Sequence, residues 1–201
     1  PRKIVIVIYD MNGMIQGKNA SMPLIIHNHG STFPAENHME IPLYRAICGS
    51  AAAPTYFEPY QWKNGDREEI WTDGSQTENS STLSNYLICR DKHTGDKVKR
   101  KNISALQIGN GTVYTYENPT RSTGWKTPKR LRGAIGSIVQ SGEIYSIRAM
   151  EKMLGPAFYN LASPLPKPID LADYKKIAEM ISFAQKVDLK ECQKWLQGYF
   201  V

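Results

Sequence analysis

Residues Arg45–Pro59 read RAICGSAAAPTYFEP, and the pair Asp73 and Gly74 follows fourteen residues after Pro59. The small residues of this stretch favour a helix end that packs tightly against a neighbouring strand, because short side chains let two backbones approach closely. An Asp-Gly pair favours a tight loop. The stretch therefore predicts a close helix–strand contact, followed by a loop that presents one carboxylate.

The N-terminal run at 3–10, KIVIVIYD, predicts a strand that is buried on both faces of a sheet. Its β-branched residues are continuous, with no alternation of polar and apolar positions, and this pattern is typical of sheets covered on both sides. We therefore expect an α/β fold with a central sheet flanked by helices. The pair Asn12 and Gly13 predicts the turn that ends this strand, and Met22–His27 predicts a second strand.

Helical spacing, hairpin signals and apolar runs predict the remaining elements. Helices are expected at Ile41–Ser50, at 78–89, at Ala134–Leu154 with a potential break at Gly142, around Tyr174–Ala184 and at Leu189–Leu196. A hairpin is expected around Asn64-Gly65-Asp66, a strand at Ile103–Thr112 that ends in a glycine turn, and loops at 28–40 and 113–132.

A chain of 201 residues with 41% hydrophobic residues is expected to form one domain. Its net charge of +6 favours a negatively charged binding partner. Much of the charge lies in two clusters: Lys92, His93, Lys97, Lys99, Arg100 and Lys101, and then Arg121, Lys126, Lys129, Arg130 and Arg132. Solvated basic loops are the simplest interpretation of each cluster alone. Nucleic acid is disfavoured because only Trp125 offers base stacking. Peripheral contact with an anionic membrane fits the charge better.

Three widely spaced cysteines argue against both a disulfide framework and a zinc site, and favour a reducing compartment. Cys48 and Cys89 are expected to be buried and inert within helices. His27 and His29 lie two apart and can share one face of a strand, but no third ligand has a recognisable spacing. No apolar run approaches the roughly 20 residues that span a bilayer. We therefore expect neither metal nor cofactor, and a cytoplasmic or peripheral membrane location.

The order of these pieces resembles the patatin-like phospholipase family. The resemblance rests on the small-residue run that ends in Pro54 and two aromatic residues, on Asp73 and Gly74, on Asn79, and on the strand that ends at Gly109. It implies a three-layer α/β/α fold and a lipid acyl hydrolase of phospholipase A type that acts on phospholipid or other acyl esters through a Ser-Asp dyad. It also implies that Asp73 is the catalytic acid residue and that Gly74 and Asn79 support its loop. The chain departs from the family pattern at Ser75, Ser80 and Ser81.

The G-x-S-x-G elbow that carries the nucleophile of this family is absent from the sequence. The only glycines four apart are Gly13 and Gly17, with Ile15 midway between them. Ser50 is a conceivable nucleophile, but it is not flanked by such an elbow. Asp10 is a second carboxylate, and it is expected to cap the turn at Asn12 and Gly13. The resemblance therefore implies that residues 1–201 are the C-terminal part of a single patatin-like domain, with the nucleophile in a missing N-terminal part. A non-catalytic remnant that binds a membrane or a partner is the alternative. A basic nucleic-acid-binding protein is a second, weaker alternative.

Overall fold

The computed structural model describes residues 3–28, 41–91, 96–109, 111, 128–167, 169 and 172–200, and within 128–135 only the backbone. In this part of the chain, β1 (Val5–Ile15), β2 (Lys18–His27), β3 (Tyr60–Asn64) and β4 (Arg67–Asp73) form one sheet, and β5 (Ala105–Ile108) and β6 (Phe158–Leu161) form a second. The α-helices are α1 (Leu43–Ser50), α2 (Thr82–Arg90), α3 (Pro128–Leu154), α4 (Ile177–Ala184) and α5 (Lys190–Tyr199). Short 3-10 helices are η2 (Gly74–Gln76), η3 (Arg100–Asn102), η5 (Gly155–Ala157) and η6 (Tyr174–Lys176).

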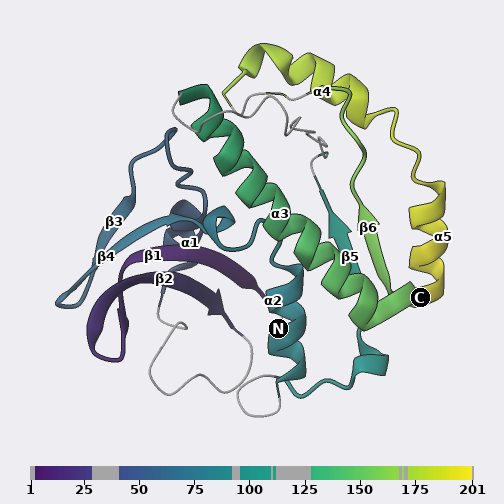
Figure 1. Ribbon diagram of the computed structural model, residues 1–201. Coiled ribbons are helices and arrows are strands. Elements are labelled where there is room, and N and C mark those ends of the chain that lie inside the picture. The colour runs from purple at the N-terminus through teal and green to yellow at the C-terminus, as the bar shows by residue number, and fades with distance from the viewer. Residues whose placement is uncertain are drawn as a thin grey trace.

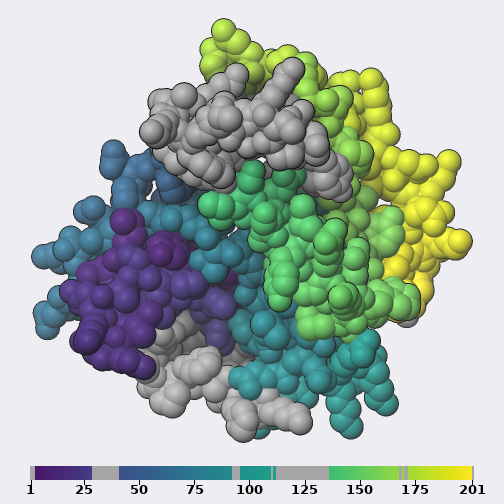
Figure 2. Space-filling model, viewed as in Figure 1, coloured from purple at the N-terminus to yellow at the C-terminus, as the bar shows by residue number. Residues whose placement is uncertain are grey.

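The mixed α/β class predicted from the sequence is confirmed. The larger sheet has the strand order β2-β1-β4-β3 with antiparallel pairs throughout, and the smaller sheet is a parallel β5–β6 pair. Helix α3 runs diagonally through the middle of the view, between the two sheets (Figure 1). The β1–β2 hairpin and the C-terminal helices lie at opposite sides of the molecule (Figure 2).

The prediction of a turn at Asn12 and Gly13 is wrong, because β1 continues through both residues. The register between β1 and β2 shifts between Asp10 and Gly13, so β1 absorbs an extra residue as a β-bulge and keeps its pairing. The chain turns instead at Gln16 and Gly17, which both have positive φ angles, 51° and 76°. That conformation matches the two-residue turns that join antiparallel strands without splaying them.

The hairpin predicted around Asn64-Gly65-Asp66 is confirmed. Asn64 pairs with Arg67, which leaves Gly65 and Asp66 as a two-residue loop, and Gly65 adopts a φ of 60°. Helix α1 is also close to its predicted range. Helix α2 begins at Thr82 rather than at the predicted residue 78, and residues 78–81 before it are not helical.

The first hydrophobic core lies between the larger sheet and α1. Its fully buried members include Ile8 and Trp71, both with 0% of their surface exposed, and Ala46 of α1 packs against them. A Cβ atom at Gly49 would lie 2.8 Å from Cε3 of Trp71, so only glycine lets α1 approach the indole this closely. The tight contact between a helix end and a strand, predicted from the small residues, is therefore confirmed.

The second core joins α2, α3 and the smaller sheet through Tyr86, Met150, Leu154 and Phe158. Helix α3 is continuous through Gly142, so the potential break there does not occur. The helix begins at Pro128, inside the range predicted as a loop, and proline is well tolerated in a first helical turn. Residues 29–40 of the loop expected at 28–40 and residues 113–127 of the loop expected at 113–132 lie outside the described residues, as do His29, His38 and Trp125.

The cysteine prediction is partly wrong. Cys48 is exposed, because α1 turns Ala46 and Gly49 toward the sheet and leaves Cys48 on another side. Cys89 is partly buried, and burial together with the nearby negative charge of Asp96 raises the pKa of its thiol. A raised pKa keeps the thiol protonated and therefore weakly nucleophilic near neutral pH.

None of the described helices combines the length and the apolar character needed to cross a membrane.

The packing at Gly49 yields a test in which two Gly→Ala substitutions in helices have opposite effects. Gly49→Ala forces a methyl group against Trp71 and should lower the free energy of unfolding by about 1–3 kcal/mol. Gly136→Ala in α3 meets open space and should raise it by about 0.5–1 kcal/mol, because alanine restricts the unfolded chain. Urea unfolding of both variants measures the difference. Equal effects would contradict the close α1–Trp71 contact.

Candidate functional site

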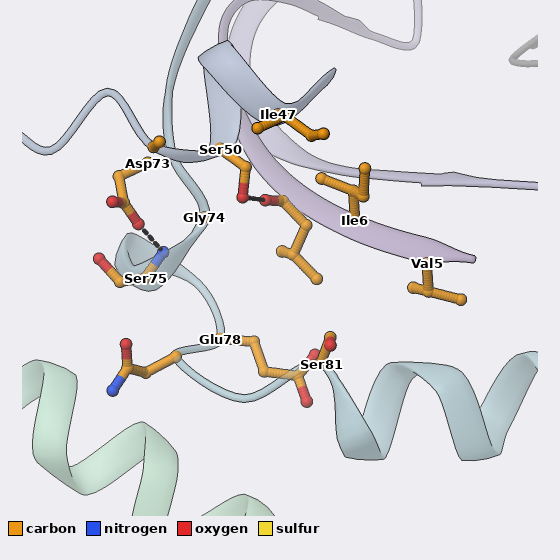
Figure 3. A pocket seen from close by; sticks show the side chains of 12 residues that line it. Val5, Ile6, Ile47, Ser50, Asp73, Gly74, Ser75, Glu78 and Ser81 are labelled. Carbon is orange, nitrogen blue, oxygen red and sulfur yellow. Dashed lines mark hydrogen bonds between the residues drawn. The ribbon is translucent and has the colours of Figure 1, made fainter. Parts of the chain in front are cut away.

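A cavity of about 350 Å³ lies where β4 ends beside β1 and the C-terminal end of α1 (Figure 3). Its lining combines strand residues Val5, Ile6 and Val7, helix residues Ile47, Ser50 and Ala51, and the segment after β4 with Asp73, Gly74, Ser75, Glu78, Asn79 and Ser81. The structure thus brings all three residues that the resemblance identified, Asp73, Gly74 and Asn79, to one cavity.

Asp73 is the last residue of β4, and two hydrogen bonds hold it in place. Its backbone N–H donates to the carbonyl oxygen of Ala52 at 3.1 Å. Its Oδ1 atom accepts the N–H of Ser75 at 2.7 Å and so caps η2. The small-residue stretch and the Asp-Gly loop, far apart in the sequence, therefore meet directly. Because Asp73 is only partly buried, its carboxylate remains accessible from the cavity.

Gly74 permits the closest backbone contact of the site. A Cβ atom at this position would lie 2.1 Å from the carbonyl oxygen of Val7 and 2.6 Å from its carbonyl carbon. These are backbone atoms of a central strand and cannot move aside easily. Gly74 therefore lets the Asp73 loop lie directly against β1.

Asn79 lies at the rim of the cavity, and its side chain bonds to a different element. Its Nδ2 atom donates to Oε2 of Glu143 in α3 at 3.2 Å. This bond ties the segment after the Asp73 loop to the long helix. Asn79 thus positions the cavity wall through α3.

Glu78 is a second carboxylate of the cavity that the sequence analysis missed. Its Oε2 atom accepts the hydroxyl of Ser84, and its Oε1 atom accepts the Ser84 N–H at 3.4 Å. Burial raises the pKa of Glu78 above its ordinary value, although the bonds from Ser84 and Leu83 oppose that change. Its place just before α2 is a sequence signal for an acidic residue at a helix N-terminus.

Ser50 lines the same cavity, but its hydroxyl is engaged elsewhere. The Oγ atom donates to the carbonyl oxygen of Val7 at 2.7 Å. Its proton is therefore directed at β1 rather than at the carboxylate of Asp73. Among the described residues, the hydrogen-bond partner of that carboxylate is the Ser75 N–H.

The cavity also borders an open strand edge. Strand β4 pairs with β1 only at Ile8, Tyr9 and Asp10, and beyond Asp73 its chain turns into η2. Successive residues of a strand point their backbone groups to opposite edges, and Ile4 bonds toward the β2 side through Asn28. The backbone groups of Val5 and Val7 therefore point toward the cavity, where the Val7 carbonyl oxygen accepts the Ser50 hydroxyl. Within the described chain, no strand pairs with Val5–Val7 on that side.

Asp10 lies outside the cavity and has a structural role. It is 3% exposed, its Oδ2 atom accepts from Arg67 at 2.9 Å, and its Oδ1 atom accepts the Asn12 N–H at 2.9 Å. The expected cap at Asn12 is therefore present, although it stabilises a bulge rather than a turn.

The described residues contain no cluster of three His, Cys, Asp or Glu side chains that could hold a metal ion. His27 lies in β2, whereas His29 and His38 fall outside the described part. Of the two basic clusters, the structure describes the side chains of Lys97, Lys99, Arg100 and Lys101 around η3. Those of the second cluster lie outside the described residues.

A scan against protein-family models and a search of curated proteins gave no match for this chain. The site is therefore defined by its geometry alone. The cavity offers one accessible carboxylate held by the Ser75 N–H, a second carboxylate whose pKa is raised by burial, and an edge of β1 with which no described strand pairs. Such a site can accept a proton from a hydroxyl group placed between β1 and Asp73.

The raised pKa of Glu78 predicts a pH-dependent contribution to stability. The folded chain binds this proton more tightly than the unfolded chain, so the resulting stability is present below the ordinary pKa of 4.5. It is lost as the pH rises through the folded-state pKa. Glu78→Gln cannot ionise, so the stability of the wild type relative to this variant should fall over the pH range above the ordinary pKa of 4.5. Denaturant unfolding across this range measures the difference, and a constant or rising value would contradict the assignment.

Proposed function

We propose that this chain is the C-terminal part of a patatin-like lipid acyl hydrolase of phospholipase A type, in which Asp73 is the base of a Ser-Asp dyad. One observation carries the proposal: the Asp73 N–H bonds to Ala52, so the small-residue stretch and the Asp-Gly loop form one unit beside a cavity. The resemblance rests on the order of these two motifs in the sequence. Their contact in space supports it.

The chemical role of Asp73 follows from its surroundings. Ester hydrolysis by a serine requires a group that accepts the hydroxyl proton, and a carboxylate beside the serine can do this without histidine. The Ser75 N–H fixes Oδ1 of Asp73 at 2.7 Å, which leaves Oδ2 for the nucleophile. Preorganisation of this kind avoids reorientation of the carboxylate during the reaction.

The serine of the proposed dyad comes from outside these 201 residues, which contain no G-x-S-x-G segment. The edge of β1 at Val5–Val7 lies beside Asp73, and within the described chain no strand pairs with it there. The Val7 carbonyl oxygen already accepts the Ser50 hydroxyl, so an incoming strand would pair chiefly at Val5. A strand added there would complete the larger sheet and bring its residues to the cavity. We propose the three-layer patatin fold for the resulting domain, with phospholipid as substrate and an anionic membrane as the surface on which it acts.

A non-catalytic interaction module is the second candidate. The same open edge favours it, since backbone groups at a sheet edge can bind an extended peptide from any partner. In that case the carboxylate of Asp73 would serve only to cap η2. Substitution of Asp73 separates the two functions.

Asp73→Asn should abolish most turnover in the protein that also carries the serine segment. The amide oxygen can still accept the Ser75 N–H, but asparagine cannot accept the serine proton, so the chemical step should slow by about 10²–10⁴-fold. Steady-state hydrolysis of a short-chain phospholipid measures this. Asp66→Asn, in the exposed β3–β4 turn, is the matched control and should retain normal turnover. Near-normal activity of Asp73→Asn with unchanged melting would rule out its role as a base.

The 201-residue chain alone should not hydrolyse phospholipids or p-nitrophenyl esters. It presents the carboxylate but no serine whose hydroxyl bonds to it among the described residues. The rate of ester hydrolysis should equal the rate in buffer without protein, and a fluorophosphonate should label no serine of the chain. Activity that disappears on labelling, with the label mapped by mass spectrometry to a serine such as Ser50, would place the nucleophile within the chain.

A further inference from the structure

A second hollow of about 530 Å³ is lined in part by residues just before and after the Asp73 loop, and the proposed dyad makes no use of it. It is lined by Met11 of β1, by the segment Pro54–Pro59 that follows α1, and by Thr72 and Gln76. Thr72 immediately precedes Asp73, and Gln76 follows it by three positions. We name this hollow the aromatic groove, after Tyr56 and Phe57.

We propose that the aromatic groove binds a single long alkyl chain of a lipid. Its apolar side chains stand open to solvent: Phe57 is 64% exposed, Met11 46% and Tyr56 43%. Exposed aromatic and methionine side chains gathered in one hollow are typical of surfaces that bind apolar ligands. The volume of the groove falls within the range of small-molecule sites.

The backbone that carries these side chains is held in a tight turn. Thr55 has a φ of 74°, which is unusual for a β-branched residue. The N–H groups of Tyr56 and Phe57 both donate to the carbonyl oxygen of Ala53, at 3.1 and 3.0 Å. The loop is therefore a tight turn that presents the aromatic rings, and little further ordering is required on binding.

The polar groups of the groove favour hydrocarbon over other occupants. Gln76 Nε2 donates to Thr72 Oγ1, so these two side chains already satisfy each other. An incoming peptide strand has no free ladder here, because Trp71 pairs with both Asp10 and Tyr60, and Thr72 pairs with Tyr9. The charged residue of the lining is Glu58, which disfavours phosphate and other anions. An uncharged alkyl chain satisfies all three constraints.

The position of the groove beside Asp73 indicates that this alkyl chain is the acyl chain of the substrate. That assignment rests on the proposed function, whereas the affinity of the groove for hydrocarbon does not. The two statements can therefore fail separately.

The test is a fluorescence titration of the 201-residue chain with a neutral pyrene-labelled monoacylglycerol below its micelle concentration. The wild type should bind the probe, and Phe57→Ser should weaken binding by about tenfold or more, the effect of losing one large apolar contact. Met11→Ser should weaken it in the same direction and covers the case in which the first variant does not fold. Phe200→Ser is the matched control, since Phe200 is 58% exposed and follows α5, outside the groove. Its affinity should be unchanged.

Failure of the wild type to bind the probe would overturn the inference. So would equal affinity of both groove variants and the wild type, or an equal loss in Phe200→Ser. Asp73→Asn should bind the probe as the wild type does, because its carboxylate faces the other cavity. Tight probe binding combined with normal turnover of Asp73→Asn would leave the groove intact and remove the proposed dyad.

Discussion

The burial of Trp71 is the interaction on which the arrangement of this molecule depends. Its side chain is fully buried, packs edge-on against Trp62 with ring centroids 5.2 Å apart, and donates its indole N–H to Glu69 at 3.3 Å. Gly49 lets α1 lie directly on the indole. This contact sets the height of α1 above the sheet. As a consequence, the chain that leaves α1 at Ala52 meets Asp73 at the end of β4.

Buried charges reinforce the same sheet. Arg67 reaches Asp10 at 2.9 Å and Glu69 at 3.3 Å, and both carboxylates are almost completely buried. Burying a carboxylate is costly unless it is paired, so these contacts fix β4 beside the bulge of β1. The pairing explains why β1 does not turn at Asn12 and Gly13. Asn12 also donates from Nδ2 to the backbone of Glu68 at 2.7 Å, which holds the bulge against the β3–β4 hairpin.

The segment around Asp73 contributes to two surfaces of different character. One is the cavity with two carboxylates, the Ser50 hydroxyl and the open edge of β1. The other is the aromatic groove. In the proposed function, the ester group of a lipid would lie in the cavity and its hydrocarbon chain in the aromatic groove. Gly74 holds this segment against Val7, and any residue with a Cβ atom there would shift both surfaces together.

The sequence by itself determined the local elements. The β-branched run specified β1, the Asn64-Gly65-Asp66 signal specified the β3–β4 hairpin, and small residues specified the close contact of α1. It also placed Asp73 in a tight loop. These features follow from short-range preferences of the backbone. Only the tertiary structure decided the bulge in β1, the exposure of Cys48, the burial that raises the pKa of Glu78, and the aromatic groove. Each depends on which distant segment packs against it, and such contacts leave no periodic signal in the sequence.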